Sequence, residues 1–198
     1  MRQFNLKILQ KHNPTTKTLR WFQMLPKKTY CVKYELGDLI KEQEFELALW
    51  LLTELLNKSQ NVKFTSYVSK LVLPIYEKQC PGDDQPHKAI SIADQYLLSP
   101  LCIIKKRANK RGYSGIPRTD YTELADYAAA ACGYTARVVG AVGTAKAGVF
   151  ARYAIDSAVK SQGFNGDEFK KKIIDYGVLL LTTNERIFRG KPSIANQK

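Results

Sequence analysis

The sequence predicts a mainly α-helical protein, a compact bundle of five to seven helices with a possible small β element near the N-terminus. Three observations predict this class. Apolar residues recur at a spacing of about 3.6 residues from residue 36 onward. Proline, glycine and capping residues divide the chain into segments of helical length. The segment 125–158 consists almost wholly of small residues, which suit closely packed helices.

Length and composition suit one globular domain. The chain has 198 residues, 44% of them hydrophobic and 25% charged, which is enough for a sizeable core. We expect a basic, poorly assigned segment at 1–35, a helical domain at 36–189 with a basic loop at 105–118, and a C-terminal tail at 190–198. The sequence shows neither a signal peptide nor a membrane-spanning helix, so we expect no membrane partner.

The first 35 residues are the hardest to assign. Two sets of residues alternate with polar ones, as in short strands: Phe4, Leu6 and Ile8, then Tyr30, Val32 and Tyr34. Residues 13–16 indicate a turn, so a small hairpin is one interpretation. Residues 19–22 could equally start a short helix.

The first clear helix is expected to start at Asp38, a candidate N-cap, and to continue through residue 56. Its apolar positions recur at helical spacing and describe one buried face. Trp50 falls beside that face. We interpret Trp50 as a core residue, with an exposed interface anchor as the alternative.

A second helix is predicted from Phe64 to Gln79, after a connection at residues 57–62. Pro74 lies inside this helical pattern. Proline removes one intrahelical hydrogen bond, so we expect a kink or break near residues 70–71.

The turn that follows is the most informative motif of the chain. It reads Cys80-Pro81-Gly82-Asp83-Asp84-Gln85-Pro86-His87-Lys88-Ala89-Ile90. Pro81 and Gly82 end one helix and reverse the chain. Asp83 or Asp84 can cap the next helix, and Pro86 suits its first turn. The motif therefore launches a third helix, predicted at 87–98.

Two further helical regions complete the chain. Thr119 or Asp120 is expected to cap a stretch that extends to about residue 161. A single helix of that length would measure about 60 Å, so we expect a break near 140–144. Its small residues predict tight intramolecular packing, with a partner or dimer surface as the alternative. Asn165 is expected to cap the last helix.

The turn motif resembles that of the predicted all-helical immunity proteins of bacterial polymorphic toxin systems, the fifth numbered immunity family. The run Ala48-Leu49-Trp50-Leu51-Leu52 and the alanine-rich segment 128–158 are similar to that family as well. The resemblance covers roughly residues 36–181. It implies a cytoplasmic protein that binds and neutralises a cognate toxin without catalysis.

Positive charge is concentrated in two segments that contain no acid. The net charge is +13, and residues 1–34 hold eight basic side chains while residues 95–119 hold six. Such segments favour an anionic partner: an acidic protein face, a nucleic-acid backbone or an anionic membrane surface. The second segment supplies the candidate partner-binding residues, Lys105, Lys106, Arg107, Lys110, Arg111 and Tyr113.

Several interpretations of the second basic segment remain open. It could be a solvated connecting loop, or Tyr113 could stack on a base of single-stranded nucleic acid. We put first an immunity-type protein that neutralises a toxin or other effector by stoichiometric occlusion; the alternative is a basic helical nucleic-acid-binding protein. Because this chain is basic, a toxin partner is expected to be acidic at the contact. The oligomeric state stays open.

The sequence offers little for catalysis. Asp83, Asp84 and His87 form the only local group that mixes carboxylates with a histidine, and could in principle serve metal or acid–base chemistry. We favour a structural role for the aspartates at a helix N-terminus. We therefore expect no enzyme, no cofactor and no metal site. The cysteines lack metal-ligand spacing and are expected to be free, mostly buried thiols: Cys31, Cys80, Cys102 and Cys132.

Overall fold

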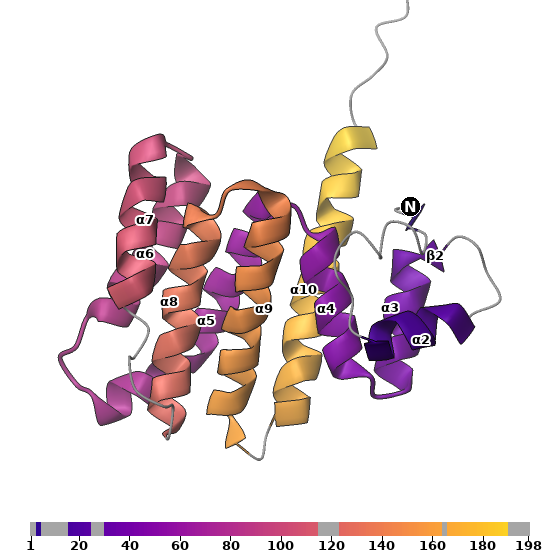
Figure 1. The fold of residues 1–198 in the computed structure, drawn as a ribbon, viewed down its shortest axis with the longest axis horizontal. Helices are drawn as coiled ribbons and strands as arrows, with labels where there is room; N and C mark the ends of the chain where they lie inside the picture. The colour runs from indigo at the N-terminus through magenta and orange to yellow at the C-terminus, as the bar shows by residue number, and fades with distance from the viewer. Residues whose placement is uncertain (1–2, 5–15, 25–29, 115–122, 164–165, 190–198) are drawn as a thin grey trace, which may run out of the picture.

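The computed structural model of the chain describes residues 3–4, 16–24, 30–114, 123–163 and 166–189. Within these ranges the protein has nine helices and one short antiparallel strand pair (Figure 1). The elements are β1 (Gln3–Phe4), α2 (Thr16–Met24), β2 (Tyr30–Cys31), α3 (Val32–Lys41), α4 (Phe45–Leu55), α5 (Lys58–Gln79), α6 (Gln85–Leu98), α7 (Cys102–Ser114), α8 (Leu124–Gly140), α9 (Gly143–Ser161) and α10 (Gly166–Arg189). The mainly helical class is confirmed. The expected number of five to seven helices is wrong, because the N-terminal region and the basic segment add helices.

The described part of the N-terminal region is mostly helical. β1 and β2 pair over two residues each, which adds no sheet layer to the fold. The predicted alternation does not continue as a strand, because α3 begins at Val32. Leu36 and Leu39 are buried in the core, so packing of a helical face outweighs the β-propensity of the preceding residues. Leu6 and Ile8 lie outside the described residues.

Two helices occupy the region where one was predicted to start at Asp38. α3 continues through Asp38 to Lys41, so the prediction that Asp38 is an N-cap is wrong. The chain then turns through Gln43, whose φ of 60° is left-handed, and α4 begins at Phe45. Trp50 of α4 belongs to the core, with 6% of its surface exposed, which confirms its predicted packing role.

α5 starts earlier than predicted and runs through its proline. The Asn57 side chain accepts a hydrogen bond from the Gln60 backbone N–H, and the Gln60 side chain accepts one from the Asn57 N–H, both at 2.9 Å. This reciprocal cap makes the expected connection at 57–62 the first turn of the helix. Pro74 does not end the helix. It is exposed, so water can hydrate the carbonyl that proline leaves unbonded.

The alanine-rich segment breaks where predicted. α8 ends at Gly140 and α9 begins at Gly143, which has a φ of 80°. A Cβ on Gly140 would lie 1.8 Å from Oδ1 of Asn109 in α7, and one on Gly148 would lie 3.1 Å from the Thr53 carbonyl oxygen in α4. These small residues therefore serve close contacts within the molecule, as the packing interpretation predicted.

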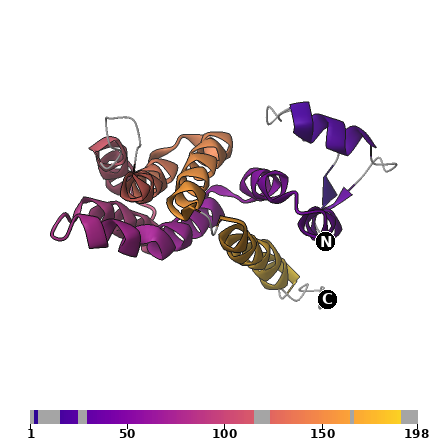
Figure 2. The same ribbon diagram turned by 90° about the horizontal axis from the view of Figure 1, so that it is seen from below.

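Consecutive helices from α4 to α10 alternate in direction (Figure 1). α8 packs against α5, α6, α7 and α9, so these five helices form one group. α4 and α10 pack against each other and against α9, and α10 also packs against α5. α3 packs on α4, and Figure 2 shows α2 and α3 at the far end of the molecule from α6 and α7.

The core has two main parts that differ in side-chain size. The larger part joins α3, α4, α5 and α10 through bulky residues such as Leu52, Phe64 and Ile174. The other part lies among α6, α7, α8 and α9 and is rich in alanine and valine, for example Ala108 and Val138. Small side chains bring α7, α8 and α9 close together, whereas bulky ones separate α4 and α10 from α9.

Some expectations fall outside what the structure describes. The candidate caps Thr119, Asp120 and Asn165 lie in undescribed segments, as does the predicted tail at 190–198. Across the described ranges, none of the helices combines the length and apolar character needed to span a membrane.

The cysteines allow a direct test of burial. Cys132 in α8 is buried, and burial raises the pKa of its thiol to about 12, whereas Cys80 and Cys102 are exposed. The expectation of mostly buried thiols is therefore wrong for two of these three residues.

We expect iodoacetamide at pH 7.5 to alkylate Cys80 and Cys102 in the native protein, and Cys132 only after denaturation, because the thiolate is the nucleophile. Peptide mass spectrometry checks this, and native labelling of Cys132 at the same rate as Cys80 would contradict the buried position.

Candidate partner-binding surface

The basic segment is a helix over Cys102–Ser114, and the predicted loop is wrong over those residues. Its inner face is set by Ile104, Ala108 and Gly112, which are four residues apart and buried. A Cβ on Gly112 would lie 2.4 Å from Cγ of Arg137 in α8. Close packing on α8 and α6 therefore fixes which side chains of α7 face outward.

The outer face of α7 carries cations without acids. Lys106, Arg107 and Lys110 are exposed and Lys105 is partly exposed, and the helix contains no aspartate or glutamate. Within the described part of the chain, no ion pair engages Lys105, Lys106 or Arg107. Arg111 belongs to the same helix, as does Tyr113, but their side chains are outside the description. Four of the six predicted residues thus occupy exposed or partly exposed positions of α7.

The positive charge of α7 affects Lys58, at the start of α5. Burial, and then the nearby charge of Lys105, lowers the pKa of Lys58. The Lys58 Nζ donates a 2.5 Å hydrogen bond to the Ala141 carbonyl oxygen, and it lies 5.3 Å from the centre of the Tyr96 ring. A cation is therefore held in a partly buried site, where it links the ends of α5, α6 and α8.

Apolar side chains are exposed beside these cations. Leu98 ends α6 and is 88% exposed. Leu101, just before α7, and Ile103, in its first turn, are more than half exposed. Exposed leucine and isoleucine next to arginine and lysine form a mixed surface of the kind that protein interfaces use.

The hydrogen bonds of the Pro-Gly-Asp-Asp turn are local and structural. Gly82 has a φ of 95°, which favours glycine. Asp83 accepts hydrogen bonds from the Gln85 backbone N–H at 2.9 Å and from the Tyr76 hydroxyl at 2.5 Å. These two bonds hold the pKa of Asp83 below its usual value. Pro86 is buried in the first turn of α6.

The other polar residues of the turn have separate partners. Asp84 occupies the N-cap position of α6 without a side-chain cap bond, and pairs instead with Lys88 at 2.6 Å. His87 pairs with Glu77 of α5 at 2.5 Å. The described residues include no group of three histidine, cysteine or acidic side chains that could hold a metal ion. Asp83, Asp84 and His87 are therefore each paired with a different neighbouring residue.

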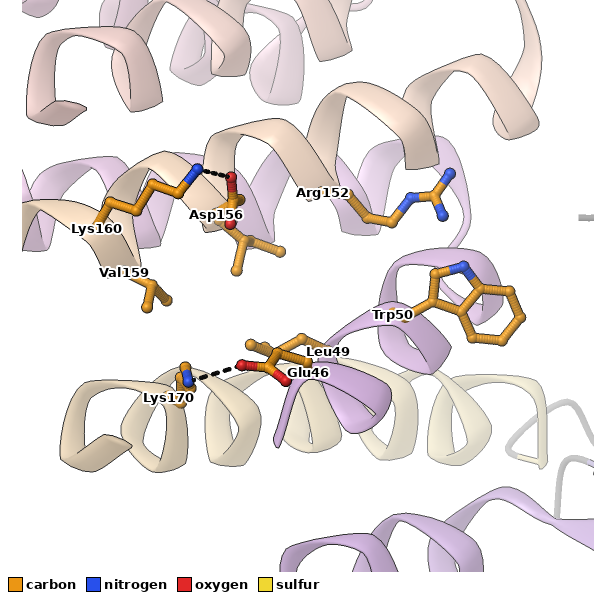
Figure 3. Close-up of a pocket in the computed structure, with 9 residues that line it drawn as sticks. Glu46, Leu49, Trp50, Arg152, Asp156, Val159, Lys160 and Lys170 are labelled. Carbon is orange, nitrogen blue, oxygen red and sulfur yellow. Dashed lines mark hydrogen bonds and ion pairs between the residues drawn. The ribbon is translucent and has the colours of Figure 1, made fainter. Parts of the chain in front are cut away.

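A groove between α4, α9 and α10 was not predicted from the sequence (Figure 3). It has a volume of about 350 Å³. Leu49, Trp50, Ile155 and Val159 form its apolar walls, and charged residues of all three helices surround them. Trp50 was the only signal in the sequence, because the other residues are brought together only by the tertiary packing of three separate helices.

The chain is a mainly helical protein whose described surface has two features of different chemistry, the basic helix α7 and the apolar groove. Residues 51–175, well over half of the chain, match the family described as Imm-5 like putative immunity protein. The chain therefore belongs to this family, in agreement with the resemblance of its turn motif. Neither the curated proteins nor the solved structures provide a significant match.

Proposed function

We propose that this chain is a cytoplasmic immunity-type protein that binds a toxin or other effector and neutralises it by stoichiometric occlusion, without catalysis. We place the contact site on α7 because this helix exposes Lys106, Arg107 and Lys110 and contains no acid. Membership of the immunity family supports the role, and α7 lies within the matched residues.

The chemistry of α7 defines the partner surface. A helix face with several cations and no acid attracts a surface of opposite charge and repels a basic one. The exposed Leu98 and Ile103 then need apolar partners, which a nucleic-acid backbone does not offer. We therefore propose an effector whose contact face is acidic at its rim and apolar at its centre.

A triple charge reversal tests the contact. The variant Lys106→Glu, Arg107→Glu and Lys110→Glu should weaken partner binding by about 100-fold, because three attractive contacts become repulsive. The matched control reverses three exposed lysines of other helices: Lys78, Lys146 and Lys172. Both variants carry the same net charge, so only the position of the change differs, and the control should keep wild-type affinity.

The measurement begins with nuclease-treated affinity capture from the source cells. The captured protein is then co-expressed with each variant, and growth is scored. The proposal requires a stoichiometric partner that is toxic alone and is neutralised by the wild type and the control, but less by the α7 variant. Recovery of nucleic acid alone, lost in high salt, would overturn it in favour of a basic nucleic-acid binder.

A further inference from the structure

The structure points to a second binding site that is independent of α7: we propose that the groove between α4, α9 and α10 binds a small amphipathic carboxylate, a molecule with an apolar body and one carboxylate group. No residue that lines the groove belongs to α7. At about 350 Å³, the volume is within the range of pockets that take small molecules.

The walls suit an apolar body. Leu49 and Trp50 come from α4, and Val159 of α9 lies across the groove from Leu49 (Figure 3). Ile155, one turn before Val159 on α9, also lines the groove. Burying apolar ligand surface between such side chains is favourable, at roughly 25 cal/mol per Å². The two sides of the groove belong to helices kept apart by bulky core residues, so the space is set by the fold.

One end of the groove has a hydrogen-bond donor that lacks an acceptor. Trp50 is 94% buried, and its indole N–H has no partner among the described residues. Figure 3 shows the indole nitrogen on the edge of the ring that faces Arg152. A buried donor without an acceptor is unfavourable, so a ligand oxygen at this position would be stabilising.

Arg152 can complete the carboxylate site. Its guanidinium group lies 3.5 Å from the Glu54 carboxylate, longer than a usual charge-assisted hydrogen bond. This contact leaves guanidinium donors available, since arginine has five N–H groups in a fork that matches a carboxylate. One carboxylate oxygen can accept from a guanidinium N–H that Glu54 does not use, so that Arg152 keeps its pair with the mainly buried Glu54. A small shift of the Arg152 side chain would let the other oxygen reach the Trp50 N–H, which is covered from solvent in the structure.

Two lysines add positive charge along the same groove. Lys160 pairs with Asp156 at 2.9 Å and Lys170 pairs with Glu46 at 3.2 Å (Figure 3). Lys170 also pairs with Asp167 at 3.0 Å. All three acids are mainly exposed, so these pairs contribute little and can exchange for a ligand anion. The Lys170 side chain is only 15% exposed, which keeps its charge against the groove.

Other ligand classes fit these groups less well. A cation would meet Arg152, Lys160 and Lys170, which outnumber the two acids of the lining, Glu46 and Asp156. A purely apolar molecule would leave the Trp50 N–H unpaired. A doubly charged anion such as phosphate would lose hydration against apolar walls without an apolar body to compensate. The amphipathic carboxylate alone satisfies the walls, the donor and the charges together.

The indole signals of the full chain provide a direct readout. The sequence contains two tryptophans, Trp21 and Trp50, so a ¹⁵N-labelled protein gives two indole N–H resonances, assigned with Trp21→Phe. Titration with octanoate should shift the Trp50 resonance saturably, with a dissociation constant on the order of 1 mM for so small a ligand. Octanol and octylamine are matched probes with the same chain, and should bind at least about 10-fold more weakly.

Three variants separate the proposed contacts from general stability. Trp50→Phe keeps an apolar ring and removes the donor, so calorimetry should show a loss of about 10-fold for octanoate and a smaller loss for octanol, whose hydroxyl oxygen is an uncharged acceptor. Lys160→Gln should weaken octanoate binding several-fold, whereas Lys146→Gln, on the same helix but outside the groove, should not change it. The proposal is overturned if Trp50 shows no saturable shift, or if octylamine binds as tightly as octanoate.

Discussion

Replacing Asn61 by aspartate is expected to lower the free energy of unfolding by about 3–5 kcal/mol at pH 7, the cost of an uncompensated buried charge. Asn61 is fully buried in α5, and its Nδ2 donates to the carbonyl oxygens of Thr53 at 2.9 Å and Leu56 at 3.1 Å. These carbonyls lie at the C-terminal end of α4, where intrahelical donors are missing. A carboxylate would face two acceptors and the negative end of a helix dipole.

The loss should depend on pH in a defined direction. Burial and the two carbonyl oxygens disfavour the charged form, so the pKa of the new carboxyl would be raised above about 3.9, its value in the unfolded chain. The variant's stability, relative to wild type, is then greatest below pH 4 and falls as pH rises through the raised pKa. Urea unfolding of both proteins between pH 4 and pH 8 measures this difference.

The neighbouring cap offers a matched control for Asn61. Asn57→Asp makes the same chemical change four residues earlier, at the exposed N-cap of α5. Aspartate caps as well as asparagine, and the helix N-terminus favours its charge, so stability should change by less than about 0.5 kcal/mol. Equal stability of the two variants at pH 7 would contradict the proposed role of the Asn61 amide.

The periodicity of apolar residues predicted the helices that bury one apolar face. The predicted start of α5 was wrong because a local cap sets it. The start of α5 carries an Asn57-x-x-Gln60 pattern, a capping box that marks the true N-terminus. α3 was missed for a different reason: Tyr30 and Val32 favour strands, and only contacts with α4 select the helix that buries Leu36.

The two candidate sites also differ in how far the sequence could predict them. Charge composition alone located the basic segment, and the spacing of Ile104, Ala108 and Gly112 contains the helical signal that the loop prediction overlooked. The groove could not be predicted, because Trp50, Val159 and Lys170 come from three helices that are adjacent only in the folded chain. An unpaired indole N–H is likewise a property of tertiary packing.

The second large effect is expected for Phe64→Ala, which should lower the free energy of unfolding by about 3–5 kcal/mol. Phe64 is fully buried in α5, and a Cβ on Gly177 would lie 3.3 Å from its Cζ, so the ring packs closely on α10. The cavity would open between α5 and α10, in the part of the core that depends on bulky side chains.

Phe64→Leu refills most of that volume and should cost less than about 1.5 kcal/mol, and Leu179→Ala on the exposed side of α10 about 0.5 kcal/mol or less. Chemical denaturation gives the three values. Hydrogen exchange should also show faster opening of α10 in Phe64→Ala, because α10 loses a buried contact with α5. A loss below about 1 kcal/mol, or unchanged protection of α10, would mean that Phe64 does not join these helices, and that α10 is held by its other contacts with α4, α5 and α9.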